Sequence, residues 1–163
     1  MLKKLFRLLK FVWFHPLNQN NRLASVWRVM SFQIASRIIK APIILPFVNG
    51  THLITSHGMI GATGDWYCGL REYEDMSFLL HTLQSGDLFV DVGANIGSYS
   101  ILAGTCKGVN VLAFEPIPST FSYLQKNIKL NLLDNQVIAM NIGLADQKST
   151  MHFSQNLDTN NHV

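Results

Sequence analysis

The chain has 163 residues, of which 48% are hydrophobic and 14% are charged, and its mean hydropathy is +0.17. This composition excludes a disordered polypeptide and is enough for one sizeable core. Cys68 and Cys106 lie far apart without Cys-x-x-Cys or histidine-rich spacing, so we expect no disulfide framework, no metal site and a reducing, cytoplasmic location.

The charges are divided unevenly along the chain. Residues 1–64 contain eight Lys and Arg and no acid, whereas residues 65–163 contain five Lys and Arg and ten acids, so the two parts carry +8 and −5. We therefore expect two regions, namely basic N-terminal helices with a β-hairpin over 1–64 and a partial α/β domain over 65–163. The basic region indicates an anionic partner.

The first sixteen residues, MLKKLFRLLKFVWFHP, predict a short basic amphipathic helix that ends near Pro16. Two interpretations stay open for it. The helix packs its apolar face on its own domain, or it adsorbs to an anionic membrane surface, which would make the protein membrane-peripheral. Lys10 interrupts the apolar run, which argues against a secretory signal, and no run reaches the ~18 apolar residues of a membrane span.

A second helix is expected over residues 21–40. Six apolar residues recur every three or four positions and are expected to pack in the core: Leu23, Val26, Trp27, Met30, Ile34 and Ile38. The arginines of this helix fall elsewhere, on a face that we expect to be solvated. No aromatic residue interleaves with them as a base-stacking platform requires, so we expect no nucleic-acid partner.

Three further segments precede the main sheet. Residues 42–48 and 51–55 are β-prone runs joined by Asn49-Gly50, which predicts a hairpin with a two-residue turn. Residues 56–70 are rich in glycine and aromatic residues, and we expect a loop there. Residues 72–83 predict a helix whose first-turn acids complement the positive end of its dipole.

From Asp87 onward, apolar runs alternate with helical segments. The runs 88–92, 110–116 and 136–144 read as strands, and the first is almost wholly apolar, as is typical of a strand buried on both faces. Helices are expected over 96–106 and 119–131. This alternation predicts parallel pairing through right-handed crossovers, and hence an open α/β sheet of Rossmann-like type.

The sequence FVDVGANIGSYS, residues 89–100, lies at the carboxyl end of the first strand, where such sheets bind ligands. Gly93 and Gly97 let a ligand approach the backbone, and Asp91 can pair with an ammonium group. A helix that begins near Ile96 would offer free N–H groups to a carboxylate. Glu115 ends the second strand, 24 residues after Asp91, where an acid can accept hydrogen bonds from two ribose hydroxyls.

The glycine spacing separates two classes of cofactor. A dinucleotide fingerprint, Gly-x-Gly-x-x-Gly, would have glycine where this sequence has Asn95 and Ser98, which disfavours a pyrophosphate. S-adenosyl-L-methionine has a ribose, a carboxylate and an ammonium group but no phosphate, and it fits better. A nicotinamide-dependent oxidoreductase and a non-catalytic membrane-surface or interaction module stay open as alternatives.

Four stretches together carry a family resemblance: GLREYEDMSFLLHTLQSGD, FVDVGANIGSYSIL, AFEPIPSTFSYLQKNIKLN and NIGLAD. Over roughly residues 64–150 they resemble the FkbM family of S-adenosylmethionine-dependent methyltransferases. The resemblance implies a class I methyltransferase fold and O-methylation of a glycan or small-molecule hydroxyl. It also implies six cofactor-binding residues, namely Asp91, Gly93, Asn95, Gly97, Glu115 and Asp146.

The resemblance ends before Val163. Family members continue into a fourth strand with an acid-rich motif that has no counterpart here. We therefore expect an incomplete sheet whose first strand exposes an apolar edge, a chain that is marginal alone or a fragment, and an oligomer as one way to cover that edge.

No catalytic base can be assigned from the sequence. His57, His81 and His152 are candidates by type only. Near the start of the resemblance, Tyr67, Glu72 and Tyr73 could meet a substrate.

Overall fold

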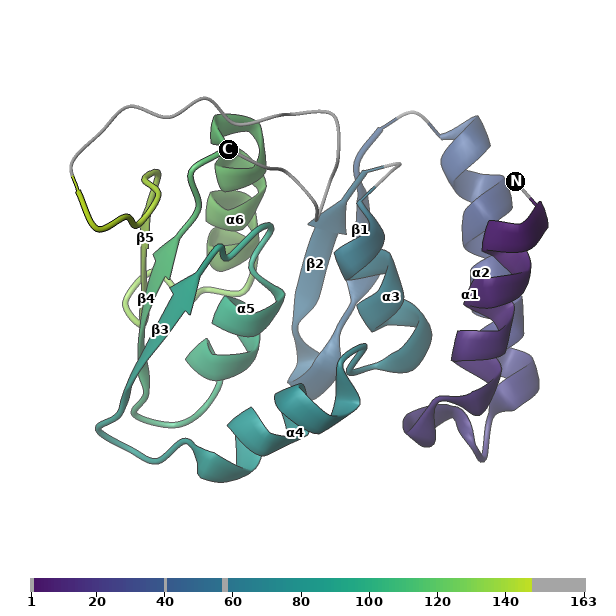
Figure 1. The fold of residues 1–163 in the computed structure, drawn as a ribbon, viewed down its shortest axis with the longest axis horizontal. Coiled ribbons are helices and arrows are strands. Elements are labelled where there is room, and N and C mark those ends of the chain that lie inside the picture. The colour runs from purple at the N-terminus through teal and green to yellow at the C-terminus, as the bar shows by residue number, and fades with distance from the viewer. Residues whose placement is uncertain (1, 40, 57–58, 148–163) are drawn as a thin grey trace.

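The computed structural model describes residues 2–39, 41–56 and 59–147, whose elements lie in successive layers (Figure 1). The first layer is a sheet of β3 (Leu88–Val92), β4 (Asn110–Phe114) and β5 (Val137–Met140), and the second contains α5 (Ser98–Gly104) and α6 (Pro118–Leu130). Next come the hairpin of β1 (Ile43–Pro46) and β2 (His52–Thr55), and α3 (Ile60–Cys68). The helix pair α1 (Leu2–Phe14) and α2 (Arg22–Ile38) forms the far end, and α4 (Tyr73–Thr82) packs on α5.

The sheet is parallel, with the strand order β3-β4-β5. Its inner face packs against the helical layer, where Val111, Ala113 and Val137 share a core with Ile101 and Leu124. Each crossover between consecutive strands passes through one helix, as the alternating pattern requires. The expected parallel α/β sheet is thereby confirmed.

The outer face of this sheet corrects one expectation. Leu88, Val90 and Val92 of β3 are exposed, and so is Ile138 of β5, because the described helices cover the inner face only. The apolar composition of β3 therefore did not mean that the strand is buried on both faces, as the sequence had indicated. Within the described ranges β3 pairs with β4 alone, so the apolar edge expected at the first strand is present.

The hairpin turn is longer than expected. The backbone N–H of Phe47 donates to the carbonyl of Thr51, which leaves a three-residue turn rather than one of two residues. Asn49 and Gly50 both have positive φ, as the Asn-Gly pair predicts. The hairpin itself is confirmed by the antiparallel pairing of β1 with β2.

The glycine-rich stretch after the hairpin forms a helix, not the expected loop. Tyr67 and Cys68 of α3 are buried in a core with Val29 and Phe32 of α2. Packing against α2 outweighs the low helix propensity of the glycines. Because Tyr67 is buried there, it does not reach a substrate site.

The apolar stripe of α2 faces solvent, which overturns the expectation that it packs in the core. Leu23 is 78% and Trp27 72% exposed. The buried face of α2 instead consists of four other residues, Ser25, Val29, Phe32 and Ser36. Across the described part of the chain, no helix is both long and apolar enough to cross a membrane.

Asn127 of α6 and Asn131, which directly follows α6, bind the edge of β2 that β1 leaves unpaired. The Asn127 Oδ1 atom accepts from the backbone N–H of Ile54 at 2.6 Å, and its Nδ2 atom donates to the carbonyl of Ile96 at 2.8 Å. One turn later, the Asn131 amide exchanges two hydrogen bonds of 2.8 Å with the backbone of His52. Since residues four apart share one helix face, α6 acts as a neighbouring strand for β2.

We expect Asn127→Leu to lower the free energy of unfolding by about 2–4 kcal/mol, because it leaves two backbone groups without partners in a buried site. Asn131→Leu is the matched control and should cost below about 1 kcal/mol, because water can replace its bonds to the exposed His52. Urea unfolding followed by circular dichroism measures both. An equal decrease in the free energy of unfolding for both variants would show that the buried hydrogen bonds of Asn127 contribute no more than the exposed ones of Asn131.

A buried carboxylate joins α3 to α5. The Asp65 Oδ2 atom accepts from the Ser98 hydroxyl at 2.6 Å, and its Oδ1 atom accepts from the backbone N–H of Arg71 at 3.2 Å. Asp65 is 1% exposed, and this burial raises the pKa of its carboxyl from 3.8 to about 6. The folded state therefore holds a proton at Asp65 over a pH range in which the unfolded state has lost it.

From this shift we expect the Asp65 contribution to the free energy of unfolding to decrease as pH rises from 4 to 7. The decrease should reach about 3 kcal/mol, because each unit of pKa difference corresponds to about 1.4 kcal/mol. Asp65→Asn should remove this dependence, while the exposed Asp134→Asn should keep it. Urea titrations of the three proteins at pH 4, 5, 6 and 7 measure the difference. Parallel curves for wild type and Asp65→Asn would contradict the assignment.

Candidate functional site

The loop between β3 and α5 has three residues in the left-handed backbone region. Gly93, Asn95 and Gly97 have φ of 78°, 51° and 100°. A Cβ atom at Gly97 would lie 2.6 Å from Leu124 Cδ1, so packing excludes a side chain there. A Cβ atom at Gly93 would meet nothing within 4 Å, which leaves open space beside the backbone. The two expected glycines therefore have different roles, because Gly97 fits the core and Gly93 borders the cavity.

Glu115, at the end of β4, holds this loop in place. Its Oε2 atom accepts from the backbone N–H of Asn95 at 2.9 Å, and its Oε1 atom accepts from the backbone N–H of Ile117 at 2.9 Å. Burial raises the pKa of the Glu115 carboxyl, and the nearby Asp91 charge raises it further. Each oxygen retains a lone pair for a further donor. The structure thus brings Glu115 to the loop, as the strand-end argument predicts.

Asp91 is also part of the scaffold. Its Oδ2 atom accepts from the Ser100 hydroxyl at 2.6 Å, which fixes α5 to β3. Burial raises the pKa of the Asp91 carboxyl, and the Ser100 bonds lower it in part. Asp91 lies in the cavity wall, so its pairing with a ligand ammonium group stays a prediction.

The backbone donors of the loop are largely used within the protein. Gly93 N–H and Ala94 N–H both donate to the carbonyl of Phe114, and Ile96 N–H donates to the Asn95 side chain. Helix α5 begins at Ser98 rather than near Ile96. The expected row of free N–H groups at Ile96 is therefore wrong, and a ligand carboxylate needs another partner.

Arg71 is a basic residue of this region that sequence reasoning did not single out. A cavity of about 190 Å³ at the carboxyl end of β3 is lined by Arg71, Tyr99, Asp91 and the loop. Arg71 pairs with Glu72, whose other oxygen accepts from the Tyr99 hydroxyl at 2.7 Å. One signal was available, since Arg71 is the only Lys or Arg between Lys40 and Lys107.

The remaining predicted residues do not join this group. Asp146 is exposed in the segment after β5, and its role at the cofactor stays a prediction. His81 is exposed on α4. His57 and His152 lie outside the described residues. The three histidines therefore stay candidates by type only.

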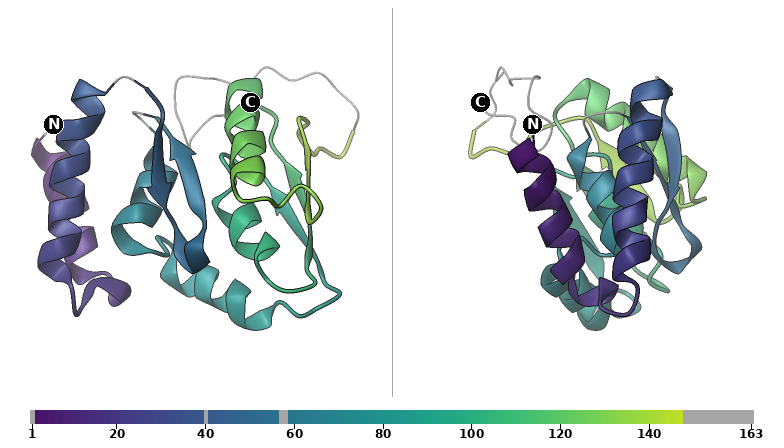
Figure 2. Two further views of the ribbon diagram at one scale, coloured as in Figure 1. Left: turned by 180° about the vertical axis from the view of Figure 1, so that it is seen from behind. Right: turned by 90° about the vertical axis from the view of Figure 1, so that its right-hand side faces the viewer.

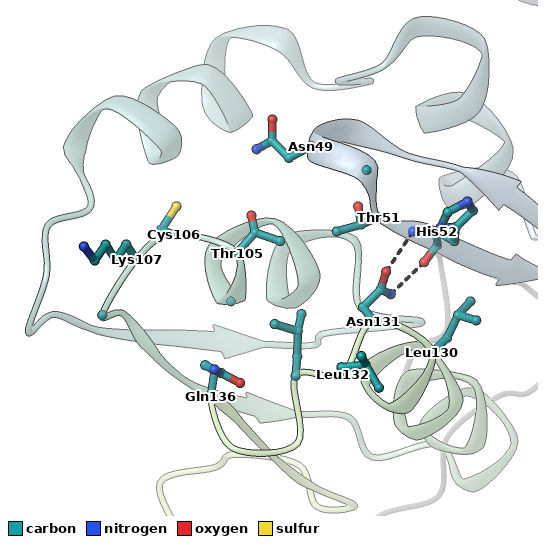
Figure 3. Close-up of a pocket in the computed structure, with 14 residues that line it drawn as sticks. Asn49, Thr51, His52, Thr105, Cys106, Lys107, Leu130, Asn131, Leu132 and Gln136 are labelled. Carbon is teal, nitrogen blue, oxygen red and sulfur yellow. Dashed lines mark hydrogen bonds between the residues drawn. The ribbon is translucent and has the colours of Figure 1, made fainter.

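A larger hollow of about 610 Å³ lies at the opposite, amino ends of β4 and β5 (Figure 3). None of the described residues that line it is an acid, and several of its polar side chains bond to nearby backbone. Asn131 bonds to His52, Thr51 to Val48 and Thr105 to Leu102. The smaller cavity beside Gly93 is the better candidate site, because the buried acid Asp91 and the basic residue Arg71 both line it.

Known proteins match the part of the chain that contains this site. The TRM5/TYW2 methyltransferase domain family matches residues 66–158. A tRNA (guanine(37)-N(1))-methyltransferase of Danio rerio is 39% identical over 71 residues, which are 44% of this chain and 14% of that protein.

Two solved structures share the fold. TYW2 of P. horikoshii, in complex with MeSAdo, aligns with a TM-score of 0.53 and 22% identity over 64% of this chain and 37% of its own. A Trm5 in complex with tRNALeu aligns with a TM-score of 0.50 and 22% identity over 63% of this chain and 28% of its own. The chain thus spans well under half the length of each of these relatives.

These matches correct two expectations. The resemblance to the FkbM family is wrong, because the matching family is TRM5/TYW2. The expectation of no nucleic-acid partner is also wrong, since one relative is a tRNA methyltransferase and another structure contains tRNALeu.

The expectation of an S-adenosylmethionine-dependent methyltransferase domain is confirmed by the family match. The division near residue 64 stays a prediction, although the match begins at residue 66. The family match covers more than half of the chain, and the chain therefore belongs to the TRM5/TYW2 methyltransferase domain family.

Proposed function

We propose that this chain binds S-adenosyl-L-methionine at the β3–α5 loop and takes part in methyl transfer to tRNA. One observation carries the cofactor part of the proposal. The Glu115 carboxylate holds the backbone of Asn95, and Asn95 and Arg71 both line the cavity. Carboxylate oxygens can accept hydrogen bonds from the ribose of the cofactor, and a guanidinium can donate to its carboxylate.

The residues present fit this cofactor at its methionine end. The cavity of about 190 Å³ is smaller than the ~300–1,000 Å³ typical of whole small-molecule sites. It is open beside Gly93, where no atom would meet a side chain. The described residues therefore form a binding site for the amino-acid part of the ligand, and the Glu115 oxygens can accept hydrogen bonds from its ribose.

The bound cofactor supplies an electrophilic methyl group on its sulfonium sulfur. Arg71 would hold the carboxylate by charge-assisted hydrogen bonds, and Glu115 would orient the ribose through the remaining lone pairs of its oxygens. Gly93 lets the ligand lie against the backbone. These residues contribute by holding the donor in one orientation, so that an acceptor atom can approach in line.

The tRNA acceptor is supported by the family rather than by the cavity. The matching domain is that of TRM5/TYW2, and the Danio rerio relative is a tRNA (guanine(37)-N(1))-methyltransferase. The basic region over 1–64 adds eight Lys and Arg with no acid, which suits a polyanion. Transfer of tritium from labelled S-adenosylmethionine to a tRNA transcript tests the acceptor. No transfer by a chain that binds the cofactor would contradict it.

We expect Glu115→Gln to weaken binding of both S-adenosylmethionine and 5′-methylthioadenosine by about 10- to 100-fold. Both ligands contain the ribose, and a hydrogen bond to a charged group is worth about 1.5–3 kcal/mol. Isothermal titration calorimetry measures the affinities. The control Asp134→Asn removes an exposed acid elsewhere and should leave them unchanged. Full affinity in Glu115→Gln would count against the ribose assignment.

Arg71→Gln should separate the same two ligands. We expect S-adenosylmethionine to bind about 10- to 100-fold more weakly, because the variant lacks the charged partner of the carboxylate. Binding of 5′-methylthioadenosine should stay within twofold, since that ligand has no carboxylate. Lys107→Gln, at an exposed site far along the chain, is the charge-matched control. An equal loss for both ligands would indicate a general disturbance of the loop.

A further inference from the structure

Helix α1 presents an outward face that carries both aromatic and basic side chains. Seven of its residues are exposed: Lys3, Lys4, Phe6, Arg7, Lys10, Phe11 and Phe14. Phe6 is 71% and Phe14 64% exposed. At 100° per residue these seven fall within one arc of the helix, with Phe11 and Phe14 between cations and Phe6 at one edge of the arc. We call this set the α1 outer face. Helix α1 itself lies at the end of the layered structure remote from the parallel sheet (Figure 2).

The opposite side of α1 is already used for packing. Leu5, Leu8 and Leu9 are partly buried, and Val12 is fully buried, in the core that α1 shares with α2 and α3. This confirms that the helix packs its aliphatic side on its own domain. A helix that lies in a membrane interface needs that aliphatic side free and its cations on the other. The arrangement of α1 therefore disfavours adsorption to a bilayer.

The cations of the α1 outer face are not engaged inside the protein. None of its four Lys and Arg belongs to an ion pair within the described residues, and residues 1–64 contain no acid to neutralise them. Two arginines of α2 behave differently. Arg28 donates to the carbonyl of Trp66 and to Ser25, and Arg22 lies over the Trp13 ring at 5.6 Å. The sequence expectation that no aromatic residue interleaves with the arginines was made for α2 alone and does not extend to α1.

Exposed aromatic rings next to unpaired cations suit the two chemical parts of a nucleotide, the base and the phosphate. Lys and Arg neutralise phosphates, and aromatic side chains stack on unpaired bases with little dependence on sequence. We propose that the α1 outer face is an RNA-binding surface that contacts phosphates through its cations and stacks unpaired bases on its rings. The family match begins at residue 66, so the matching domain does not include this surface. That the RNA is the tRNA acceptor rests on the proposed function.

The test compares two sets of substitutions in the full chain by fluorescence anisotropy with a labelled tRNA transcript. Lys4→Gln/Arg7→Gln/Lys10→Gln should reduce the slope of log affinity against log salt by about 2–3, since each phosphate contact contributes about 0.7–0.9. Phe11→Leu/Phe14→Leu should weaken binding by about 5-fold or more without changing the slope, because leucine keeps the apolar volume but cannot stack. Lys107→Gln/Lys129→Gln is the charge control, at exposed sites outside α1.

Two readouts separate this inference from its alternatives. Anionic phosphatidylglycerol vesicles replace RNA in a second series, and vesicle binding without RNA binding would overturn the proposal in favour of a membrane surface. RNA affinities in the α1 variants equal to those of the charge control would also overturn it. Calorimetry with S-adenosylmethionine on the same variants should show unchanged affinity. Failure of that cofactor binding in the wild-type chain instead contradicts the proposed function, which keeps the two failures distinct.

Discussion

The buried Asn127 side chain fixes the position of the β3–α5 loop relative to the elements that precede it. It accepts from Ile54 in β2 and donates to Ile96 in the loop, so one amide bridges three elements. A polar group buried in this way is stabilising only when both of its partners are in place. The position of the loop therefore depends on the hairpin. The hairpin in turn lies between the helical layer and α3, and through α3 it contacts the α1–α2 pair.

The same loop is held from its other side by acids. Glu115 accepts from its backbone, Asp91 fixes the helix that follows it, and Asp65 accepts from Ser98 at the start of that helix. Burial raises the pKa of all three carboxyls. Holding three acids in a poorly solvated region costs stability. The same poor solvation would strengthen hydrogen bonds between the loop and the methyl donor that we propose binds there, because hydrogen bonds are stronger where water is scarce.

The sequence predicted those residues of the candidate site whose positions follow from the ends of neighbouring parallel strands. A strand followed by Asp-x-Gly and a second strand ending in an acid place Asp91, Gly93 and Glu115 together through parallel topology alone. Arg71 was missed because its position in the cavity depends on how α3 and α4 pack. The family was misjudged for a related reason. The residues that carried the resemblance are those we propose for the methyl donor, and a donor site does not by itself identify the acceptor.

The sequence by itself determined the alternation of helices and strands and the parallel sheet, because hydrophobic periodicity and crossover handedness act locally. It also determined the left-handed positions in the loop, where glycine and asparagine are least strained. Only the tertiary structure decided which face of each element is buried. In α2 the strongest apolar stripe, including Trp27, is left in solvent while Val29 and Phe32 face inward. In α1 the packing of the leucines leaves the phenylalanines and lysines outside. Periodicity fixes which residues share a face, but contacts between elements distant in the sequence select the face that is buried.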